Sequence, residues 1–366
     1  MQDKKLSVIS NVSANSPATR KFIINGRFMA DRMQGIVRYG REILNLLEPL
    51  LQKDIHIILA VPCNAKDVPN YKNMEVVTLG NKTGILWEQL EFASFIRKHR
   101  DYIPINFCNT VPFFVQPGIT AIHDIMYKLF PENYKSIRNR FSRLWHCLQY
   151  KYITRHEKKI ITVSEFSKRE IMKYYNVEES KIVVIPAAWQ HVVEYKENFD
   201  WKMRYPYLSP MQYFFSLSTL AKNKNFRWII EVAKRNPKYT FAVVGKLYEE
   251  DLNNLPQNVK LLGYVSDMDA CSLLKNCKAF LFPSLYEGFG LPPLEALALG
   301  VDVISSDTAS MPEVLGNSVH YINPFDYEVD LEKLLAEEID SKEETLKRFS
   351  WNRGATLLLQ TLLEQE

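Results

Sequence analysis

Two glutamates, Glu287 and Glu295, lie eight positions apart in the segment LYEGFGLPPLEALALG, which covers residues 285–300. A proline disfavours the α conformation in the residue before it, so the residues before the two prolines are expected to be extended. Proline suits the first position of a helix, which Pro293 is expected to occupy. Glu287 then stands in the loop ahead of the helix, and Glu295 stands in its first turn.

The start of that helix favours an anionic ligand. Its first backbone N–H groups have no partners inside the helix and carry the positive end of the helix dipole, and phosphate oxygens are natural partners for them. Gly288 and Gly290 lack the side chains that would keep a ligand from the backbone. Taken alone, a glutamate in the first turn of a helix is explained by its favourable interaction with the helix dipole. Taken alone, glycines before a helix are explained by a turn. The whole segment predicts a site for a phosphate-containing, hydroxyl-rich ligand between two carboxylates.

Short apolar runs alternate with amphipathic runs along both halves of the chain, which predicts α/β architecture with parallel, doubly wound sheets. The expected strands are 22–25, 55–61, 74–78, 119–122, 159–163 and 182–185, then 213–217, 240–244, 259–262, 279–282 and 301–304. The expected helices are 36–50, 84–98, 138–157 and 166–175, then 226–235, 267–276, 293–299 and 328–338. Ligands of such sheets bind at the carboxyl ends of the strands, here in the cleft between two Rossmann-like domains.

The domain boundaries follow from where this alternation breaks. A segment rich in aromatic and charged residues, with Pro206 and Pro210, interrupts it. The expected parts are a flexible leader (1–20), an N-terminal domain (21–190), a linker (191–211), a C-terminal domain (212–345) and a final helix (346–366).

The composition is that of a globular protein. Its 366 residues suffice for two domains, with 46% hydrophobic and 24% charged residues. Five scattered cysteines without C-x-x-C spacing predict reduced thiols in a cytoplasmic setting and no cysteine zinc site. The net charge of +4 is too small to indicate a nucleic-acid partner. No apolar run approaches the length of about 20 residues that a membrane span needs.

The segment 285–300, after the buried-strand pattern AFLFPS (279–284), closely resembles the E-x7-E signature of the family 4 retaining glycosyltransferases. These enzymes have the two-domain GT-B fold, and the resemblance runs from about Phe22 to Trp351. It implies that the N-terminal Rossmann-like domain (21–190) lies on the acceptor side, that the C-terminal one (212–345) binds the nucleotide sugar and that the final helix (346–366) returns to the first domain. It implies that Glu295 holds the ribose hydroxyls of a nucleotide sugar and that Glu287 holds a donor-sugar hydroxyl. The backbone of Phe289, Gly290 and Leu291 would line the sugar and the phosphates.

Three further segments resemble family elements, and each also has an ordinary structural explanation. Gly35 lies in a loop before an amphipathic run and, by the resemblance to bacterial surface-polysaccharide enzymes, against the donor diphosphate. His123 follows a predicted strand, where it would face the donor sugar. Lys224 matches a basic element that holds the diphosphate; Asn223 stands where arginine is common, so Lys222 is an alternative contact. The stretches 162–168 and 189–191 also resemble family segments, with Ser164 expected to cap a helix.

Residues 138–159 combine seven basic side chains with aromatic and aliphatic ones at helical spacing. They are compatible with an ordinary packed helix that has a solvated basic face. They are also compatible with attachment to anionic lipid headgroups, near a lipid-linked acceptor.

The resemblance therefore implies a metal-independent, retaining hexosyltransferase with no cofactor beyond its nucleotide-sugar co-substrate. The loop style favours mannose or rhamnose, and the acceptor would be a growing surface polysaccharide such as O-antigen or capsule. The enzyme is expected to be cytoplasmic, or peripheral at the inner face of the plasma membrane. The alternatives are a GT-B epimerase, which would convert donor without acceptor, and a non-catalytic sugar-nucleotide-binding protein.

Overall fold

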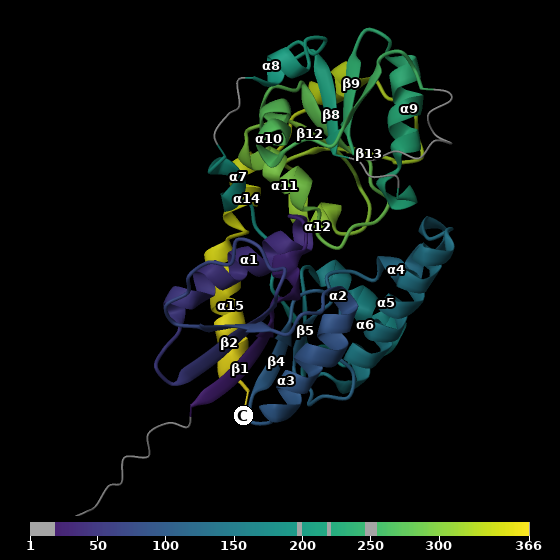
Figure 1. Cartoon of the computed structure of the whole chain (residues 1–366). Coiled ribbons are helices and arrows are strands. Elements are labelled where there is room, and N and C mark those ends of the chain that lie inside the picture. The colour runs from purple at the N-terminus through teal and green to yellow at the C-terminus, as the bar shows by residue number, and fades with distance from the viewer. Residues whose placement is uncertain (1–18, 196–199, 218–220, 246–254, 366) are drawn as a thin grey trace, which may run out of the picture.

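Two parallel sheets carry the fold of this computed structural model, and each sheet forms one domain (Figure 1). The structure describes residues 19–195, 200–217, 221–245 and 255–365. Most of the expected leader, residues 1–18, lies outside the described residues. The figure shows the domains one above the other, with the helix α12 (Met311–Leu315) at their boundary.

The N-terminal sheet has seven parallel strands in the order β3-β2-β1-β4-β5-β6-β7. The strands are β1 (Arg20–Asn25), β2 (Ile55–Pro62), β3 (Glu75–Leu79), β4 (Ile103–Asn106), β5 (Ile119–Ala121), β6 (Lys159–Thr162) and β7 (Ile182–Val184). The helices around it are α1 (Gly35–Leu47), α2 (Gly84–Leu86), α3 (Ala93–Lys98), α4 (Met126–Leu129), α5 (Ile137–His156), α6 (Glu165–Tyr175) and α7 (Gln190–Val193). A 3-10 turn, η1 (Gly26–Ala30), joins β1 to the loop before α1.

The C-terminal sheet has six parallel strands in the order β10-β9-β8-β11-β12-β13, which is the doubly wound Rossmann order 3-2-1-4-5-6. The strands are β8 (Tyr213–Leu217), β9 (Thr240–Val244), β10 (Val259–Gly263), β11 (Ala279–Phe282), β12 (Val303–Ser306) and β13 (His320–Ile322). The helices are α8 (Trp201–Arg204), α9 (Phe226–Arg235), α10 (Asp267–Lys275), α11 (Leu291–Ala298), α12, α13 (Leu331–Leu335), α14 (Lys342–Lys347) and α15 (Trp351–Leu363), with a 3-10 turn η6 (Lys222–Lys224).

The helix α15 leaves the C-terminal domain and packs against α1 of the N-terminal domain. Figure 1 shows it running from the domain boundary down the N-terminal domain. The contact is close because of a glycine: a Cβ on Gly354 would lie 2.7 Å from Cδ1 of Ile43. The buried face of α1 includes Val37, Ile43 and Leu47. The two ends of the described chain thus share one domain, which ties the two sheets together.

The start of α11 differs from the sequence-based expectation. Leu291 and Pro292 were expected to be extended, but the helix begins at Leu291, directly after Gly290 with a φ of +91°. Prolines in a first helical turn remove only N–H groups that have no intrahelical partner, and the glycine makes the sharp bend. Glu295 is consequently the fifth residue of the helix, two positions further in than expected.

Among the described residues, no helix is both long and apolar enough to cross a membrane.

Candidate active site between the two domains

Lys224 and Glu287 meet where two neighbouring strands end. β8 and β11 are adjacent in the sheet, so the loops that follow them lie side by side. Lys224 Nζ lies 2.6 Å from Glu287 Oε1, and both side chains are largely buried. The Lys224 ammonium also lies 5.3 Å from the centre of the Phe282 ring. The cation and one of the two carboxylates that the sequence predicted for the ligand are therefore brought together.

Asn223, the residue before Lys224, is a buried bridge between the loop after β8 and the loop after β11. Its side-chain amide donates to the carbonyl of Tyr286, and its backbone carbonyl accepts from Leu285 N at 2.6 Å. Asn133 of the N-terminal domain donates to its side-chain oxygen. Neighbouring Lys222 has an exposed side chain, and its backbone N–H donates to the Asn133 side chain at 2.8 Å. Asn223 thus holds the two loops together, whereas Lys222 points its charge to solvent.

Gly288 brings the two domains into contact. A Cβ at this position would collide with the backbone carbonyl of His123. The Gly288 carbonyl accepts hydrogen bonds from Ser164 Oγ at 2.6 Å and from Ser167 Oγ at 3.1 Å. Ser164 also caps α6, as predicted, by accepting from Ser167 N. A side chain in place of Gly288 would push the loop that carries Glu287 away from the N-terminal domain.

His123 follows β5 and is buried with a fixed orientation. Its Nε2 lies 2.7 Å from the carbonyl oxygen of Phe107, so this nitrogen carries the proton and donates. Burial lowers the pKa of His123 to about 4, so the imidazole is neutral at physiological pH. The ring of Tyr39 meets it edge-on at 4.9 Å. A neutral imidazole is available as a hydrogen-bonding group rather than as a source of positive charge.

Asp124, the next residue, places a second carboxyl group near Glu287. Burial raises the pKa of Asp124, a hydrogen bond from Met126 N opposes this, and the charge of Glu287 raises it further. Asp124 and Glu287 belong to different domains, and their negative charges therefore repel each other across the cleft.

Glu295 is held by the segment that was expected to be a linker. Its Oε1 lies 2.7 Å from Nε2 of His191 in α7, and Nδ1 of His191 lies 3.2 Å from the indole Nε1 of Trp351. Because an indole N–H only donates, Nδ1 must accept, which places the histidine proton on Nε2 and directs it at Glu295. His191 belongs to the stretch 189–191, which resembles a family segment, and nothing in the sequence links it to Glu295.

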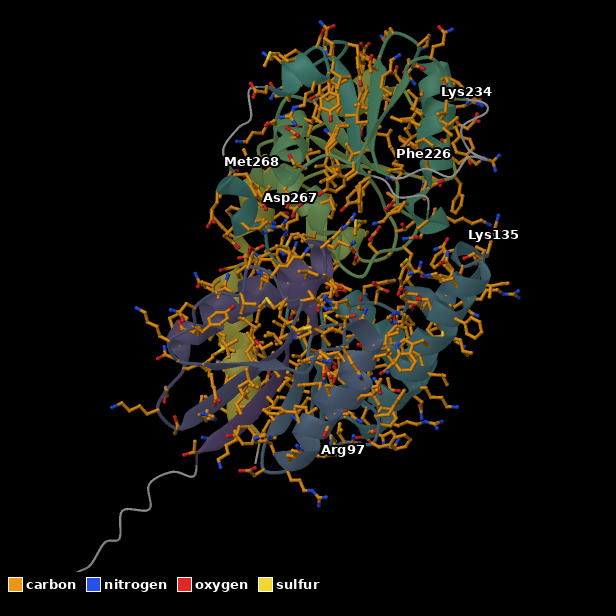
Figure 2. All side chains as sticks on the ribbon, viewed as in Figure 1. Arg97, Lys135, Phe226, Lys234, Asp267 and Met268 are labelled. Carbon is orange, nitrogen blue, oxygen red and sulfur yellow. The ribbon has the colours of Figure 1, made fainter. Side chains whose placement is uncertain are left out.

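A cavity of about 90 Å³ lies beside Glu295, between α1 and α10. Arg38 of α1 closes one side by donating to Asp267 Oδ2 at 2.9 Å and to the hydroxyl of Tyr195 at 3.0 Å. Asp267 begins α10 on the face of the C-terminal domain that is turned toward α1 (Figure 2).

Gly35 is the first residue of α1, and no atom lies within 4 Å of where its Cβ would be. A ligand can approach the backbone there.

A second helix terminus is occupied by the opposite domain. The carboxylate of Glu313, in α12, accepts from the backbone N–H groups of Glu165 and Phe166 at 2.7 Å each. These are the first residues of α6, where a negative charge is stabilised by the helix dipole. Glu313 therefore caps a helix of the N-terminal domain from the C-terminal domain, a contact that the sequence did not indicate.

A further cavity lies away from these residues. It measures about 500 Å³ and is lined by residues such as Arg20, Lys21 and Tyr102, at the amino ends of β1 and β4. Ligands of doubly wound sheets bind at the carboxyl ends, so the cleft next to Glu287 and Glu295 is the better candidate.

Within the described ranges, no group of three or more histidine, cysteine, aspartate or glutamate side chains is arranged to hold a metal ion.

The chain is similar to known glycosyltransferases in sequence and in fold. Residues 207–352 match the family model of glycosyl transferases group 1. The protein has a GT-B fold. Sucrose-phosphate synthase from Thermosynechococcus elongatus superposes with a TM-score of 0.70 at 15% identity, covering 94% of this chain and 99% of that one. Anabaena Alr3699/HepE, solved with UDP and glucose, gives 0.64 at 17% identity, covering 94% and 100%.

Curated relatives are similar over much of the sequence. The serotype-specific mannosyltransferase WbdA of Escherichia coli is 24% identical over 92% of this chain, which spans only 44% of the length of that relative. The O-antigen chain mannosyltransferase B of Escherichia coli is 28% identical over 71% of this chain and 74% of its own length. The O-antigen chain mannosyltransferase RfbU of Salmonella typhimurium is 29% identical over 60% of each chain.

Proposed function

We propose that this protein is a retaining, metal-independent hexosyltransferase of the family 4 type. It moves a hexosyl residue, mannose or rhamnose, from a nucleoside-diphosphate sugar to a growing glycan of a bacterial surface polysaccharide. The observation that carries the proposal is the pairing of Lys224 with Glu287 at the carboxyl ends of adjacent strands, in a cleft that the second domain closes. The similarity to O-antigen mannosyltransferases supports mannose as the first donor to test.

In this proposal the donor lies between the domains, and each predicted residue has one task. Lys224, the Gly35 loop and the start of α11 meet the negative charge of the diphosphate, with Lys222 as a further contact. Glu295 binds the ribose hydroxyls and Glu287 a hydroxyl of the sugar, while the backbone of residues 289–291 lines the sugar and phosphates. Neutral His123 hydrogen-bonds the sugar from the N-terminal domain. Charge stabilisation of this kind by one preorganised donor contributes about 10²–10³ in rate.

The reaction needs no enzymatic nucleophile. The bond between the anomeric carbon and the diphosphate oxygen breaks, and its electron pair stays on the diphosphate. An acceptor hydroxyl forms the new bond from the same face and passes its proton to the departing diphosphate. The configuration at the anomeric carbon is thereby retained, and Lys224 stabilises the charge that builds on the leaving group.

A thermal-shift screen against GDP, UDP, dTDP and their sugar conjugates tests the proposal. A ligand of the folded state raises stability by RT ln(1 + [L]/Kd), so saturating nucleotide shifts the melting temperature. A shift with one base identifies the donor class, and retained anomeric configuration in the product confirms the mechanism. Conversion of the donor without any acceptor would favour an epimerase. Nucleotide binding without turnover would favour a non-catalytic sugar-nucleotide-binding protein.

We also propose that α5 contacts the inner face of the plasma membrane, where the acceptor is lipid-linked. Four apolar side chains of α5, spaced four, three and four residues apart, are 49–76% exposed: Ile137, Phe141, Leu144 and Leu148. Four basic residues of the same helix are exposed beside them: Arg138, Arg140, Lys151 and Arg155. An apolar stripe flanked by cations suits an anionic bilayer surface.

Vesicle sedimentation at low and high salt tests this contact. Vesicles with anionic lipid should bind the wild type, and the double substitution Phe141→Ser and Leu144→Ser should weaken binding without unfolding the chain, because both side chains are exposed. Replacing Tyr264, which is 87% exposed on the other domain, with serine is the matched control. If the wild type binds the vesicles neither at low salt nor at high salt, the contact is refuted.

A further inference from the structure

The cavity of about 500 Å³ at the amino edge of the N-terminal sheet has no task in the proposed function. This amino-end cavity borders the starts of four neighbouring strands, β1, β4, β5 and β6. Its volume lies in the range of about 300–1,000 Å³ that small-molecule sites occupy. The cleft next to Glu287 and Glu295 lies at the opposite, carboxyl edge of the same sheet. A ligand in the amino-end cavity would therefore not overlap a donor in the cleft.

Positive charge dominates the lining of the amino-end cavity. Among the described residues that line it, Asp101 is the one acidic residue, and four are basic: Arg20, Lys21, Arg100 and Lys158. Arg20 pairs with Asp54 at 3.2 Å and Lys21 pairs with Asp101 at 2.7 Å, so these two charges are partly neutralised. Arg100 adds a charge that no described carboxylate pairs with. The lining therefore attracts an anion.

The turn that carries Arg100 is held in place by Gln116. The Nε2 atom of Gln116 lies 3.1 Å from the carbonyl oxygens of His99 and Tyr102, and 3.3 Å from that of Ile96. Tyr102 N also donates to the His99 carbonyl at 3.0 Å. These contacts fix the backbone on both sides of Arg100, whose own side chain is exposed. A charged group on a fixed backbone is preorganised for a ligand.

Another wall of the cavity consists of Pro117 and Lys158, which precede β5 and β6. A buried carboxylate joins these two segments from behind. Glu157 Oε2 accepts from Gly118 N at 3.0 Å and from Thr120 Oγ1 at 2.9 Å. The wall is therefore attached to the sheet and is not a loose surface loop.

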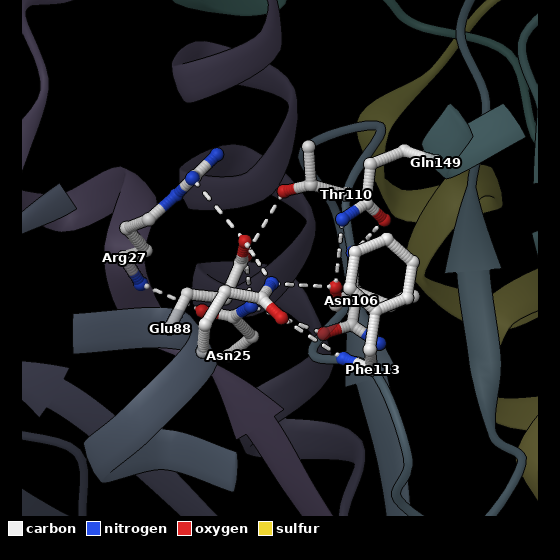
Figure 3. A network of polar contacts seen from close by, with 9 residues as sticks. Asn25, Arg27, Glu88, Asn106, Thr110, Phe113 and Gln149 are labelled. Atoms are coloured by element: carbon white, nitrogen blue, oxygen red, sulfur yellow. Dashed lines mark hydrogen bonds and ion pairs between the residues drawn. The ribbon is translucent and has the colours of Figure 1, made fainter. Parts of the chain in front are cut away.

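A buried polar network anchors this wall further (Figure 3). Thr120 Oγ1 accepts from Asn106 Nδ2 at 3.1 Å, and Asn106 Oδ1 accepts from Asn25 Nδ2 at 3.1 Å. Asn25 Nδ2 also donates to Glu88 Oε1 at 2.8 Å, and Glu88 Oε2 accepts from Arg27 Nη1 at 3.3 Å. These hydrogen bonds run from the wall of the amino-end cavity to the loop after β1. The shape of the cavity is thus set by the interior of the domain.

The lining also has an apolar part, which includes Phe22, Ile103 and Pro117. An inorganic ion would contact the basic side chains alone, whereas an organic anion would contact both parts. A phosphomonoester carries a charge of about −1.5 to −2 at pH 7 and three acceptor oxygens. Such oxygens form strong, charge-assisted hydrogen bonds with guanidinium and ammonium groups. A phosphomonoester with an apolar body therefore suits this lining.

We propose that the amino-end cavity is a second ligand site, which binds a small organic phosphomonoester. The phosphate contacts Arg100 and Lys21, and the organic part lies against Phe22 and Pro117. This ligand binds independently of the sugar nucleotide. The proposal goes beyond the proposed function and does not depend on it.

Calorimetric titration of the full chain with phenyl phosphate tests the proposal. The probe should bind saturably, and added salt should weaken binding because exposed charges are screened. Arg100→Gln and Lys21→Gln change partly or fully exposed side chains and should weaken binding by about tenfold or more. Arg97→Gln is the matched control, because Arg97 is an exposed arginine at the same end of the domain (Figure 2) but does not line the cavity.

Further probes define the ligand. Inorganic phosphate and benzyl alcohol each match one part of the lining, so both should bind more weakly than phenyl phosphate. Soluble metabolites and lipid headgroups both carry phosphomonoesters. Phenyl phosphate represents the soluble source and dihexanoyl phosphatidic acid the lipid source, and the tighter of the two identifies the source. Absence of binding by both would overturn the proposal.

Titrations with and without saturating donor nucleotide separate this site from the cleft. Phenyl phosphate should still bind when nucleotide is present, and Lys224→Ala should bind it like the wild type. Binding that disappears in either case would assign the probe to the cleft and overturn the proposal. Unchanged binding in Arg100→Gln and Lys21→Gln, or an equal loss in Arg97→Gln, would also overturn it. A wild type that binds phenyl phosphate but no nucleotide would contradict only the proposed function.

Discussion

Lys224 Nζ lies 2.6 Å from Glu287 Oε1, so the cation predicted for the diphosphate and the carboxylate predicted for the sugar neutralise each other when no donor is bound. Their side chains are 23% and 15% exposed, which leaves both within reach of a ligand in the cleft. A donor that binds here must exchange this ion pair for contacts with its own phosphates and hydroxyls. The two residues are therefore expected to respond together to substitution.

The first prediction concerns this pair. Lys224→Ala and Glu287→Ala should fold normally but lose transfer by about 10²–10³, the usual effect of removing one preorganised donor. The ion pair is partly exposed, so its loss should lower the free energy of unfolding by no more than about 1 kcal/mol. Donor turnover and chemical denaturation of each variant measure the two effects. Wild-type turnover in either variant would refute the assignment of that residue.

Lys222→Ala resolves the division of labour between the two lysines. The Lys222 side chain is exposed, while Lys224 is enclosed by Glu287 and Phe282. Lys222→Ala should therefore reduce turnover less than Lys224→Ala does. The reverse order would assign the main diphosphate contact to Lys222.

The second prediction concerns the chain of contacts from Trp351 through His191 to Glu295. Trp351→Phe keeps an aromatic ring but removes the N–H that fixes the His191 tautomer. It should lower stability by about 1–3 kcal/mol, because a buried acceptor is left unpaired. It should also weaken nucleotide binding, since Glu295 loses its oriented partner. Trp145→Phe is the matched control, because the Trp145 Nε1 has no acceptor among the described residues. Equal nucleotide shifts in both variants would contradict the prediction.

The third prediction concerns the contact between Glu313 and the start of α6. Glu313→Gln removes a charge from two backbone N–H groups at a helix N-terminus. It should lower the free energy of unfolding by about 1 kcal/mol and increase the radius of gyration in small-angle scattering, because the domains lose a contact. Glu344→Gln, at an exposed glutamate of α14, is the control. A scattering curve identical to that of the wild type would show that Glu313 does not hold the domains together.

Much of the fold was predictable because buried parallel strands are continuous apolar runs. The bounds of β8, β9 and β11 are those expected. β4 was missed because it is four residues long and contains Pro104, and β13 because it has three residues. β12 lies two residues later than expected, since Ser305 and Ser306 are buried at its end and their polar side chains concealed it.

The site was predictable only where it follows from strand order. Lys224 and Glu287 follow neighbouring strands, so their proximity is a consequence of the doubly wound topology. The contact between His191 and Glu295 depends on how α7 passes between the domains, and the helix that supplies Trp351 returns from the end of the chain. Such contacts arise from tertiary packing between distant segments, which no local pattern encodes. The same is true of Glu313 on α6.

The last prediction concerns pH. Burial lowers the pKa of His123 to about 4, whereas an unperturbed histidine titrates near about 6.5. Between these values the unfolded chain binds a proton that the folded chain excludes, so the folded state loses stability as the pH falls from about 6.5 toward 4. Above about pH 6.5 the imidazole is neutral in both the folded and the unfolded chain, so burying His123 costs no deprotonation and its contribution to stability is fully present. From pH 7.5 to pH 5 the loss due to His123 is about 2 kcal/mol.

His123→Gln removes this titration and keeps a side-chain donor for the Phe107 carbonyl. Its free energy of unfolding should therefore fall less between pH 7.5 and pH 5 than that of the wild type, as measured by chemical denaturation at the two pH values. Burial also lowers the pKa of His146 to about 4, so part of the wild-type dependence should remain. His156→Gln, at an exposed position of α5, should keep the whole dependence. A His123→Gln variant with the wild-type pH dependence would show that burial does not lower the pKa of His123 in the folded protein.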